Sequence, residues 1–193
     1  MATTKLNLGC GRNVLAGWVN VDSFPLPGID VIADLDQCAA TPLPIEDGTC
    51  SEFLLSHVVE HLSHPLPLMQ ELWRVAAPGA RMTIRVPYGS SDDAWEDPTH
   101  VRAYFIGSFG YFSQPYYWRA DYGYRGDWQC DDITLFLASH ECAKLDAAQV
   151  WSRIMKERNV VAEMVATLRC VKPARRPLRE LQVGPRIVWQ LPG

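Results

Sequence analysis

A glycine turn followed by an acid is the first feature of this 193-residue chain that could bind a ligand. Gly9-Cys10-Gly11 follows a short apolar segment, and Asp22 closes the next one. Glycine lets the backbone approach a ligand closely, and a carboxylate after the next strand can accept hydrogen bonds from ribose hydroxyls. A Gly-x-Gly pair alone is weak, because it also fits an ordinary turn beside a solvated acid. The combination favours a nucleoside pocket.

Two of the five histidines stand where a general base could act. His100 follows Asp97 by three residues, and His57 follows an apolar run. Histidine titrates near neutral pH, so we take His100 with Asp97 as the first candidate and His57 as the second. The alternative is that His100 only pins its own loop through Asp97. If His100 is the base, His100→Ala should leave cofactor binding intact and lower turnover by about 100-fold.

The segment from His57 to His61 also spells His-x-x-Glu-His, a motif known from zinc enzymes. That motif needs both histidines on one helix face and a further ligand. His57 directly follows an apolar, strand-like run, and the sequence indicates no third ligand. We therefore predict no metal site. One equivalent of zinc in the purified protein would reverse that prediction.

Short apolar segments near residues 5–8, 18–21, 30–33, 52–56 and 81–86 are the elements that must position these residues. A helix is expected over 58–75, with a break at 63–65 and an end at Pro78-Gly79. Strands joined by such connections predict an α/β fold, an open and mostly parallel Rossmann-like sheet with helices on both faces. Ligands bind at the carboxyl ends of such strands, the edge that holds Gly9–Gly11, Asp22, Asp34 and Ser56-His57.

An aromatic-rich insertion follows the fifth strand. Residues 104–128 hold eleven of the twenty aromatic residues. Core packing, an aromatic substrate pocket or lid, and a homodimer interface all fit this density. Further along, we expect a strand over 133–138, a helix over 147–158, and strands over 160–171 and 187–191. The predicted organisation is one domain over 1–193, with a cofactor-binding half (5–87), an aromatic-rich substrate or lid region (88–145) and a C-terminal helix and strands (146–193).

The distribution of charge restricts the ligand. The net charge is −4, and residues 13–73 contain nine acids but no lysine or arginine. Such a field repels phosphate and nucleic acid and favours a cationic or neutral ligand. The end of the chain, 172–193, is basic, which fits a solvated surface or a site for an acidic partner.

Composition also bears on the compartment. No apolar run approaches the roughly 20 residues of a membrane span, and the first residues lack the apolar core of a signal peptide. Six cysteines without a Cys-x-x-Cys pair are typical of reduced, buried thiols. We therefore expect a cytoplasmic protein without a membrane partner.

The spacing around the glycine turn selects among nucleoside cofactors. A dinucleotide needs a third glycine and a helix N-terminus for its pyrophosphate. Only 13 positions separate Gly9 from Asp22, which leaves little room for a helix, and Arg12 is the one basic residue nearby. S-adenosylmethionine carries a ribose, an adenine and a sulfonium cation but no phosphate. An acidic, glycine-turned pocket suits it better.

Five segments in the first half of the chain follow one another in an order typical of one enzyme family. They read LNLGCG at 6–11, GWVNVD at 17–22, LPIEDG at 43–48, SHVVEHL at 56–62 and LWRVAAPGA at 72–80. Together they resemble the class I S-adenosylmethionine-dependent methyltransferases. Asp97–His100, followed by Phe109–Phe112, resembles a subgroup of small bacterial members. Little resemblance extends past Gln114.

The resemblance implies roles by position. Gly9, Cys10 and Gly11 would approach the methionine part of S-adenosylmethionine, and Asp22 with the adjacent Ser23 would hold the ribose. The remaining cofactor positions are Asp34 and Leu35 for the adenine, and Ser56 and His57 below the methyl group. The chain departs from the family pattern at two points. Asn7 stands where family members often carry an acid, and the connection between the first two strands is short, which would leave the methionine end of the cofactor site more open.

The sequence therefore predicts a methyltransferase that uses S-adenosylmethionine, releases S-adenosyl-L-homocysteine and methylates an O or N atom of a small molecule or glycan. The acidic first half argues against a nucleic acid acceptor. Two alternatives remain, a nicotinamide-dependent oxidoreductase and a pseudo-enzyme that binds the cofactor as a scaffold.

Overall fold

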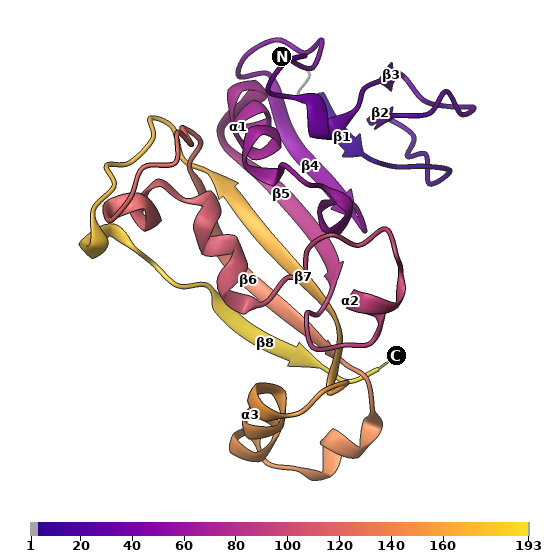
Figure 1. Cartoon of the computed structure of the whole chain (residues 1–193), viewed down its shortest axis with the longest axis vertical. Helices are drawn as coiled ribbons and strands as arrows, with labels where there is room; N and C mark the ends of the chain where they lie inside the picture. The colour runs from indigo at the N-terminus through magenta and orange to yellow at the C-terminus, as the bar shows by residue number, and fades with distance from the viewer. Residues whose placement is uncertain (1–3, 193) are drawn as a thin grey trace.

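The computed structural model of the chain describes residues 4–192, which form one eight-stranded sheet with helices packed on it (Figure 1). The strand order is β3-β2-β1-β4-β5-β7-β6-β8, and only the two pairs that include β7 are antiparallel. The predicted open, mostly parallel, Rossmann-like sheet is therefore confirmed. The strands are β1 (Thr4–Leu8), β2 (Val19–Asp22), β3 (Val31–Ile32), β4 (Cys50–Ser56), β5 (Ala76–Pro87), β6 (Trp128–Leu137), β7 (Val161–Cys170) and β8 (Arg186–Gln190).

The helical elements lie between the strands. They are η1 (Leu35–Gln37), η2 (Val59–His61), α1 (Pro65–Val75), α2 (Asp93–Glu96), η3 (Ile106–Phe112), η4 (Gln114–Trp118), η5 (His140–Lys144), α3 (Ala147–Lys156) and η6 (Arg179–Leu181), where η marks a 3-10 helix. None of the helices within residues 4–192 is both long and apolar enough to cross a lipid bilayer.

Alternation of side chains explains why the central strands are buried. Leu6 and Leu8 on β1, and Phe53 and Leu55 on β4, enter the core at every second position. Met82, with Ile84 and Val86, does the same on β5. The core cluster runs from β1 to β7, so the edge where β1, β2 and β4 end rests on a rigid support.

The helix expected over 58–75 is two elements. Val59–His61 form only the short turn of η2, and α1 begins at Pro65. Proline fits the first turn of a helix but restricts the residue before it to extended backbone, so the chain must break at His64. Leu68, Leu72 and Val75, the periodic residues, are buried on α1.

The expected turn at Pro78-Gly79 is an irregularity inside β5. The strand pairs with β4 from Ala76 onward, and the register then shifts so that Glu52 opposes Arg81. Gly79 has a φ of +79°, a left-handed conformation that glycine adopts without strain. The extra residues bulge out, and pairing resumes.

Loops connect β1 to β2 and β2 to β3 within the described chain, as the short spacing predicted. Asparagine side chains hold the first loop. The amide of Asn7 donates to the Asn13 carbonyl at 2.8 Å and to the Asn20 side-chain oxygen at 2.9 Å. Leu15 N donates to that same oxygen at 2.9 Å. Asn7, where family members often carry an acid, therefore fixes the glycine loop.

The aromatic insertion contributes to the core. Six of its eleven aromatic side chains are buried, namely Tyr104, Phe109, Phe112, Tyr117, Tyr124 and Trp128. Trp128 contacts Phe53 edge-to-face and donates its indole N–H to the Met69 carbonyl. Core packing thus accounts for about half of the aromatic density, and the exposed remainder includes Tyr111 and Tyr122.

Part of the basic C-terminal segment binds within the chain. Lys172 donates to the carbonyls of Arg74 and Ala76 at the end of α1. Arg175 pairs with Asp127, which is fully buried. These two cations stabilise the fold, whereas Arg186 lies at the surface and pairs with Asp132. All six cysteines are buried and unpaired.

Candidate active site

Two neighbouring cavities open along the carboxyl ends of the parallel strands. The smaller one, about 180 Å³, is lined by Gly9, Asp22, Ser23, Ala33, Asp34, Leu35, His57, Val58, His61 and Leu62. The larger one, about 420 Å³, is lined by His57, His61, Pro87, Asp93, Glu96, Asp97 and His100. His57 and His61 belong to both linings. The sheet therefore joins the glycine turn to all three histidine and acid candidates in one region.

Asp22 is held by backbone donors. Gly11 N donates to Asp22 Oδ2 at 2.8 Å, and Phe24 N donates to Oδ1 at 3.0 Å. Each carboxylate oxygen can accept a second hydrogen bond. The side chain is 9% exposed, and it lines the smaller cavity. Asp22 is thus held in one orientation, and each of its oxygens keeps the capacity to accept a further hydrogen bond.

The backbone conformation of the turn favours glycine at both positions, and close packing adds a second reason at Gly9. Gly9 and Gly11 have φ values of +58° and +53°, which disfavour other residues. A Cβ at Gly9 would lie 2.7 Å from Val58 Cγ2, whereas a Cβ at Gly11 would meet no atom within 4 Å. The backbone at Gly9 is therefore packed against the wall of the smaller cavity.

The other predicted cofactor positions divide into two groups. Ser23, Asp34 and Leu35 line the smaller cavity, with Asp34 also accepting from Asp36 N as the cap of η1. Cys10, Gly11 and Ser56 do not line it. Cys10 is buried beside the turn, Gly11 acts through its bond to Asp22, and Ser56 is exposed at the end of β4.

His57 sits in an unusual backbone conformation between two carboxylates. Its φ of +55° is rare for a residue other than glycine and is found at functional sites. Its Nε2 lies 2.8 Å from Glu163 Oε1, and its Nδ1 lies 3.4 Å from Glu60 Oε1. Glu163 is itself fixed by Arg85 at 2.6 Å. This chain of contacts orients the imidazole.

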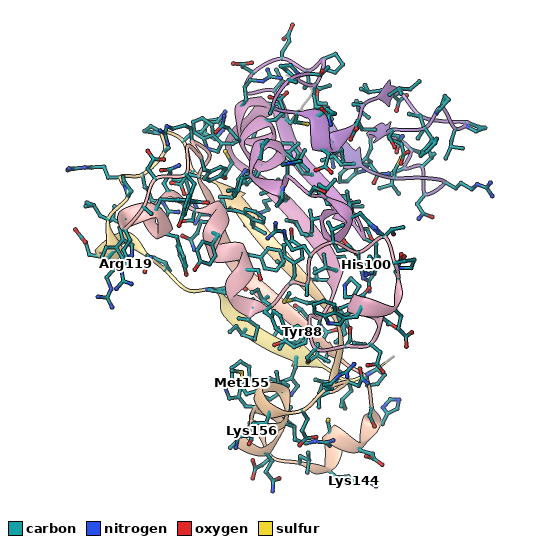
Figure 2. All side chains as sticks on the ribbon, in the orientation of Figure 1. Tyr88, His100, Arg119, Lys144, Met155 and Lys156 are labelled. Atoms are coloured by element: carbon teal, nitrogen blue, oxygen red, sulfur yellow. The ribbon has the colours of Figure 1, made fainter. Side chains whose placement is uncertain are left out.

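Asp97 and His100 meet on the loop after α2, where Figure 2 labels His100. Thr99 Oγ1 donates to Asp97 Oδ1 at 2.6 Å, and Thr99 N donates to the same oxygen at 2.8 Å. These bonds lower the pKa of the Asp97 carboxyl. His100 Nε2 is 3.9 Å from Asp97 Oδ2, too far for a hydrogen bond. The loop is pinned by Thr99.

Glu60 and Glu163 are important neighbours that the sequence did not identify. Glu60 is 2% exposed, and burial raises the pKa of its carboxyl, while its own backbone N–H and then the charges of His57, His61 and His100 oppose that rise. Glu60 stands inside the His-x-x-Glu-His motif, so its position was a usable signal. Glu163 lies on β7, far along the chain, and only the pairing of β5 with β7 brings it near.

A third and larger cavity, about 690 Å³, lies against the aromatic insertion. Ser63 to Pro67 form one wall, and Arg102 to Phe105 form another. Tyr111, with Phe112, Tyr117 and Tyr122, adds aromatic surface. The insertion therefore lines a cavity besides filling the core.

Part of the chain is similar to a known protein family. Residues 6–84 match a family model described as a methyltransferase domain. No curated protein sequence matches the chain.

Solved structures extend the likeness to nearly the whole fold. A SAM-dependent methyltransferase from Archaeoglobus fulgidus superposes with a TM-score of 0.59 at 14% identity, over 87% of this chain and 86% of that one. The YcgJ protein from Bacillus subtilis gives 0.55 at 10% identity, over 89% and 93%. A SAM-dependent methyltransferase from Aquifex aeolicus gives 0.53 at 16% identity, over 88% and 82%. At such identities the likeness is one of fold.

Proposed function

We propose that the chain is a class I S-adenosylmethionine-dependent methyltransferase that methylates an oxygen or nitrogen atom of a small molecule or glycan. The methyltransferase-domain match over residues 6–84 and the shared fold support this proposal. One observation carries the proposal. The two neighbouring cavities share His57 and His61, so a donor in the smaller cavity and an acceptor in the larger one would meet at these residues. Methyl transfer needs this juxtaposition, because much of its catalysis is positioning.

The smaller cavity is the proposed cofactor site. Asp22, with its two backbone bonds, would accept the ribose hydroxyls, and Asp34 and Leu35 would contact the adenine. Gly9 to Gly11 would approach the methionine part, with Cys10 packed behind. Ser56 and His57, at the end of β4, would lie below the methyl group. A nicotinamide dinucleotide is disfavoured, since the β1–β2 connection offers no helix N-terminus for a pyrophosphate.

The larger cavity supports the class of acceptor. Asp93, Glu96 and Asp97 give its lining negative charge, and the three histidines add nitrogen acceptors or donors. Hydroxyl and amine groups can donate to such a wall, whereas a phosphate or nucleic acid would be repelled. The lining therefore supports a polyhydroxylated or cationic small molecule.

His57 is the base that the geometry favours. Its two ring nitrogens lie 2.8 Å from Glu163 Oε1 and 3.4 Å from Glu60 Oε1, so the two carboxylates favour the protonated ring that a general base forms. The acceptor's lone pair would attack the methyl carbon as the carbon–sulfur bond breaks, leaving neutral S-adenosylhomocysteine. The proton released by the acceptor would pass to His57, where Glu60 and Glu163 would stabilise the cation. His100 and Asp97 keep the alternative base role.

We also infer a single domain over the chain. One cluster of buried residues extends from Leu6 on β1 to Cys170 on β7 without a break. This continuity supports an arrangement in which the cofactor half, the aromatic region and the C-terminal elements fold together.

A screen for the acceptor tests the proposal. The purified chain is incubated with S-adenosylmethionine and with pools of amines, sugars and polyols, phenols, carboxylates and nucleic acids, and S-adenosylhomocysteine formation is measured. We expect turnover in the amine or hydroxyl pools. Turnover restricted to nucleic acids would contradict the proposed acceptor class, and turnover restricted to carboxylates would contradict the larger, acidic cavity as the acceptor site. Binding of S-adenosylhomocysteine without turnover in any pool would favour a cofactor-binding scaffold.

A further inference from the structure

A glutamate and two histidines converge beside the larger cavity. Glu60, His61 and His100 each place one atom that could ligate a metal within 4.8 Å of the other two. The arrangement is built by the backbone, because the N–H groups of Val101 and Arg102 both donate to the Glu60 carbonyl at 2.9 and 3.2 Å. These bonds hold the loop that carries His100, labelled in Figure 2, against η2.

The carboxylate of Glu60 is buried without a hydrogen-bond donor. Only 2% of the residue is exposed, and neither carboxylate oxygen has a partner among residues 4–192. His57 Nδ1 approaches Oε1 at 3.4 Å but does not have hydrogen-bond geometry. Burying a carboxylate without a partner is costly, and proteins usually pair such a charge or use it to coordinate a metal. Glu60 thus has two free ligand atoms.

The hydrogen bonds of His61 determine which of its nitrogens is free. The Thr99 hydroxyl already donates its proton to Asp97 Oδ1, so toward His61 Nδ1, at 2.9 Å, it can only accept. The Thr99 carbonyl, 3.3 Å from Nδ1, is also an acceptor. His61 must therefore carry its proton on Nδ1, which leaves the lone pair on Nε2. Metal-binding histidines are commonly fixed in this way.

His100 presents the same pattern. Its side chain is 9% exposed, and its Nδ1 is buried without a partner among the described residues. Its Nε2 faces Asp97 Oδ2 at 3.9 Å, so a proton on Nε2 would leave the lone pair on Nδ1. Asp97 therefore orients His61 through Thr99, and its charge lies near His100 without a hydrogen bond to it. The rings of His61 and His100 lie edge-to-face with centroids 4.7 Å apart.

We propose that Glu60, His61 and His100 bind a divalent transition-metal ion, Zn²⁺ or Mn²⁺. Two imidazoles and one carboxylate suit such ions and leave open positions for water or a substrate. Ligand atoms around zinc are about 3.3 Å apart, given bonds of about 2.0–2.1 Å, so the widest pair would close by about 1–2 Å. The site differs from the His-x-x-Glu-His arrangement, because His57 stands at the end of β4 and His100 supplies the third ligand.

A metal here would bind an acceptor oxygen or nitrogen at an open position next to the cofactor cavity. That role rests on the proposed function, whereas metal binding itself does not. The competing explanation is that Glu60 is simply protonated or shares a proton with a histidine. The two explanations differ in a measurement that needs neither acceptor nor turnover.

The test is a metal titration of the tag-free chain. Bound metal is first removed with EDTA, and Zn²⁺ or, separately, Mn²⁺ is then added in the presence of a chromophoric chelator that competes for the metal. We expect one equivalent to bind to the wild type, and Glu60→Gln and His100→Ala to weaken binding by at least about 100-fold, above the usual loss for an outer-shell residue. His140→Ala, at an exposed histidine on η5, is the matched control and should bind as the wild type does.

Folding of each variant is checked by its S-adenosylhomocysteine affinity, which depends on the smaller cavity. Loss of metal binding with retained affinity for S-adenosylhomocysteine supports the site. Two results would overturn the metal site: a wild type whose affinity for metal is no higher than that of His100→Ala, or a Glu60→Gln variant that still binds one equivalent of metal. If S-adenosylhomocysteine fails to bind while metal does, the proposed function fails and the metal site stands.

Discussion

The two neighbouring cavities differ in how their polar groups are satisfied. In the smaller one, both Asp22 oxygens accept backbone N–H groups, and Asp34 caps η1. Beside the larger one, both oxygens of the buried Glu60 and His100 Nδ1 have no hydrogen-bond partner among residues 4–192. A polar group held by backbone bonds is ready for a ligand of fixed shape. A buried polar group without a partner indicates that a ligand completes the site.

This difference follows from how each cavity is assembled. The smaller cavity is made by the loops after β1, β2 and β3 together with residues 57–62 after β4. Figure 1 shows these strands at one end of the sheet, far from α3. The larger cavity combines His57 and His61 with Pro87 at the end of β5, and with α2 and the loop after it, which lie about 30–40 positions further along the sequence. Local turns can satisfy their own backbone, whereas a site assembled from separate segments leaves side chains facing one another.

The largest expected effect is on cofactor affinity when Asp22 is removed. Asp22→Ala should weaken S-adenosylhomocysteine binding by at least about 100-fold, because hydrogen bonds to a charged group contribute about 1.5–3 kcal/mol each. Asp22→Asn keeps one acceptor oxygen and should lose less. Calorimetric titration measures both, with the exposed Asp121→Ala as control. Equal affinities for Asp22→Ala and the wild type would mean that the smaller cavity is not the ribose site.

A pair of histidine variants distinguishes the proposed general base, His57, from the proposed metal ligand, His100. His57→Ala should lower kcat by about 100-fold with the acceptor that the screen identifies, because a general base typically contributes about 10²–10⁴-fold. It should still bind one equivalent of metal. His100→Ala should lose turnover and metal together. If His57→Ala retains full turnover, the base must be sought elsewhere, and His100 with Asp97 would be next.

The smallest expected effect is on stability, at the two glycines of the turn. Gly11→Ala should cost about 1–2 kcal/mol, the penalty for a side chain at positive φ. Gly9→Ala adds a contact with Val58 and should cost about 1–3 kcal/mol more, the usual range for overpacking. Urea unfolding of the two variants gives the difference. Equal losses would show that Val58 moves aside freely and that the wall of the smaller cavity is not rigid.

The sequence predicted the local parts of the site better than the assembled parts. The turn at Gly9 and the acid at Asp22 are separated by one loop, so strand patterning alone brings them to the same edge. The contact of Glu60 with His100 spans 40 positions, and that of His57 with Glu163 depends on the antiparallel pairing of β7.

Burial of a charged side chain is a second property that the sequence pattern does not predict. Glu60 reads as one more acid in an acidic stretch, and only the packed structure shows that solvent is excluded from it. The end of the helix at Val75 was predicted correctly, but Pro78-Gly79, which has the composition of a turn, forms a bulge inside β5 once β4 pairs beside it.

A crystal structure with S-adenosylhomocysteine bound tests most directly whether the smaller cavity holds the cofactor and the larger one the acceptor. The account predicts ribose oxygens within hydrogen-bond distance of the Asp22 carboxylate, with the sulfur beside His57 and facing the larger cavity. A nucleoside seated instead in the 690 Å³ aromatic cavity, with Asp22 untouched, would contradict it.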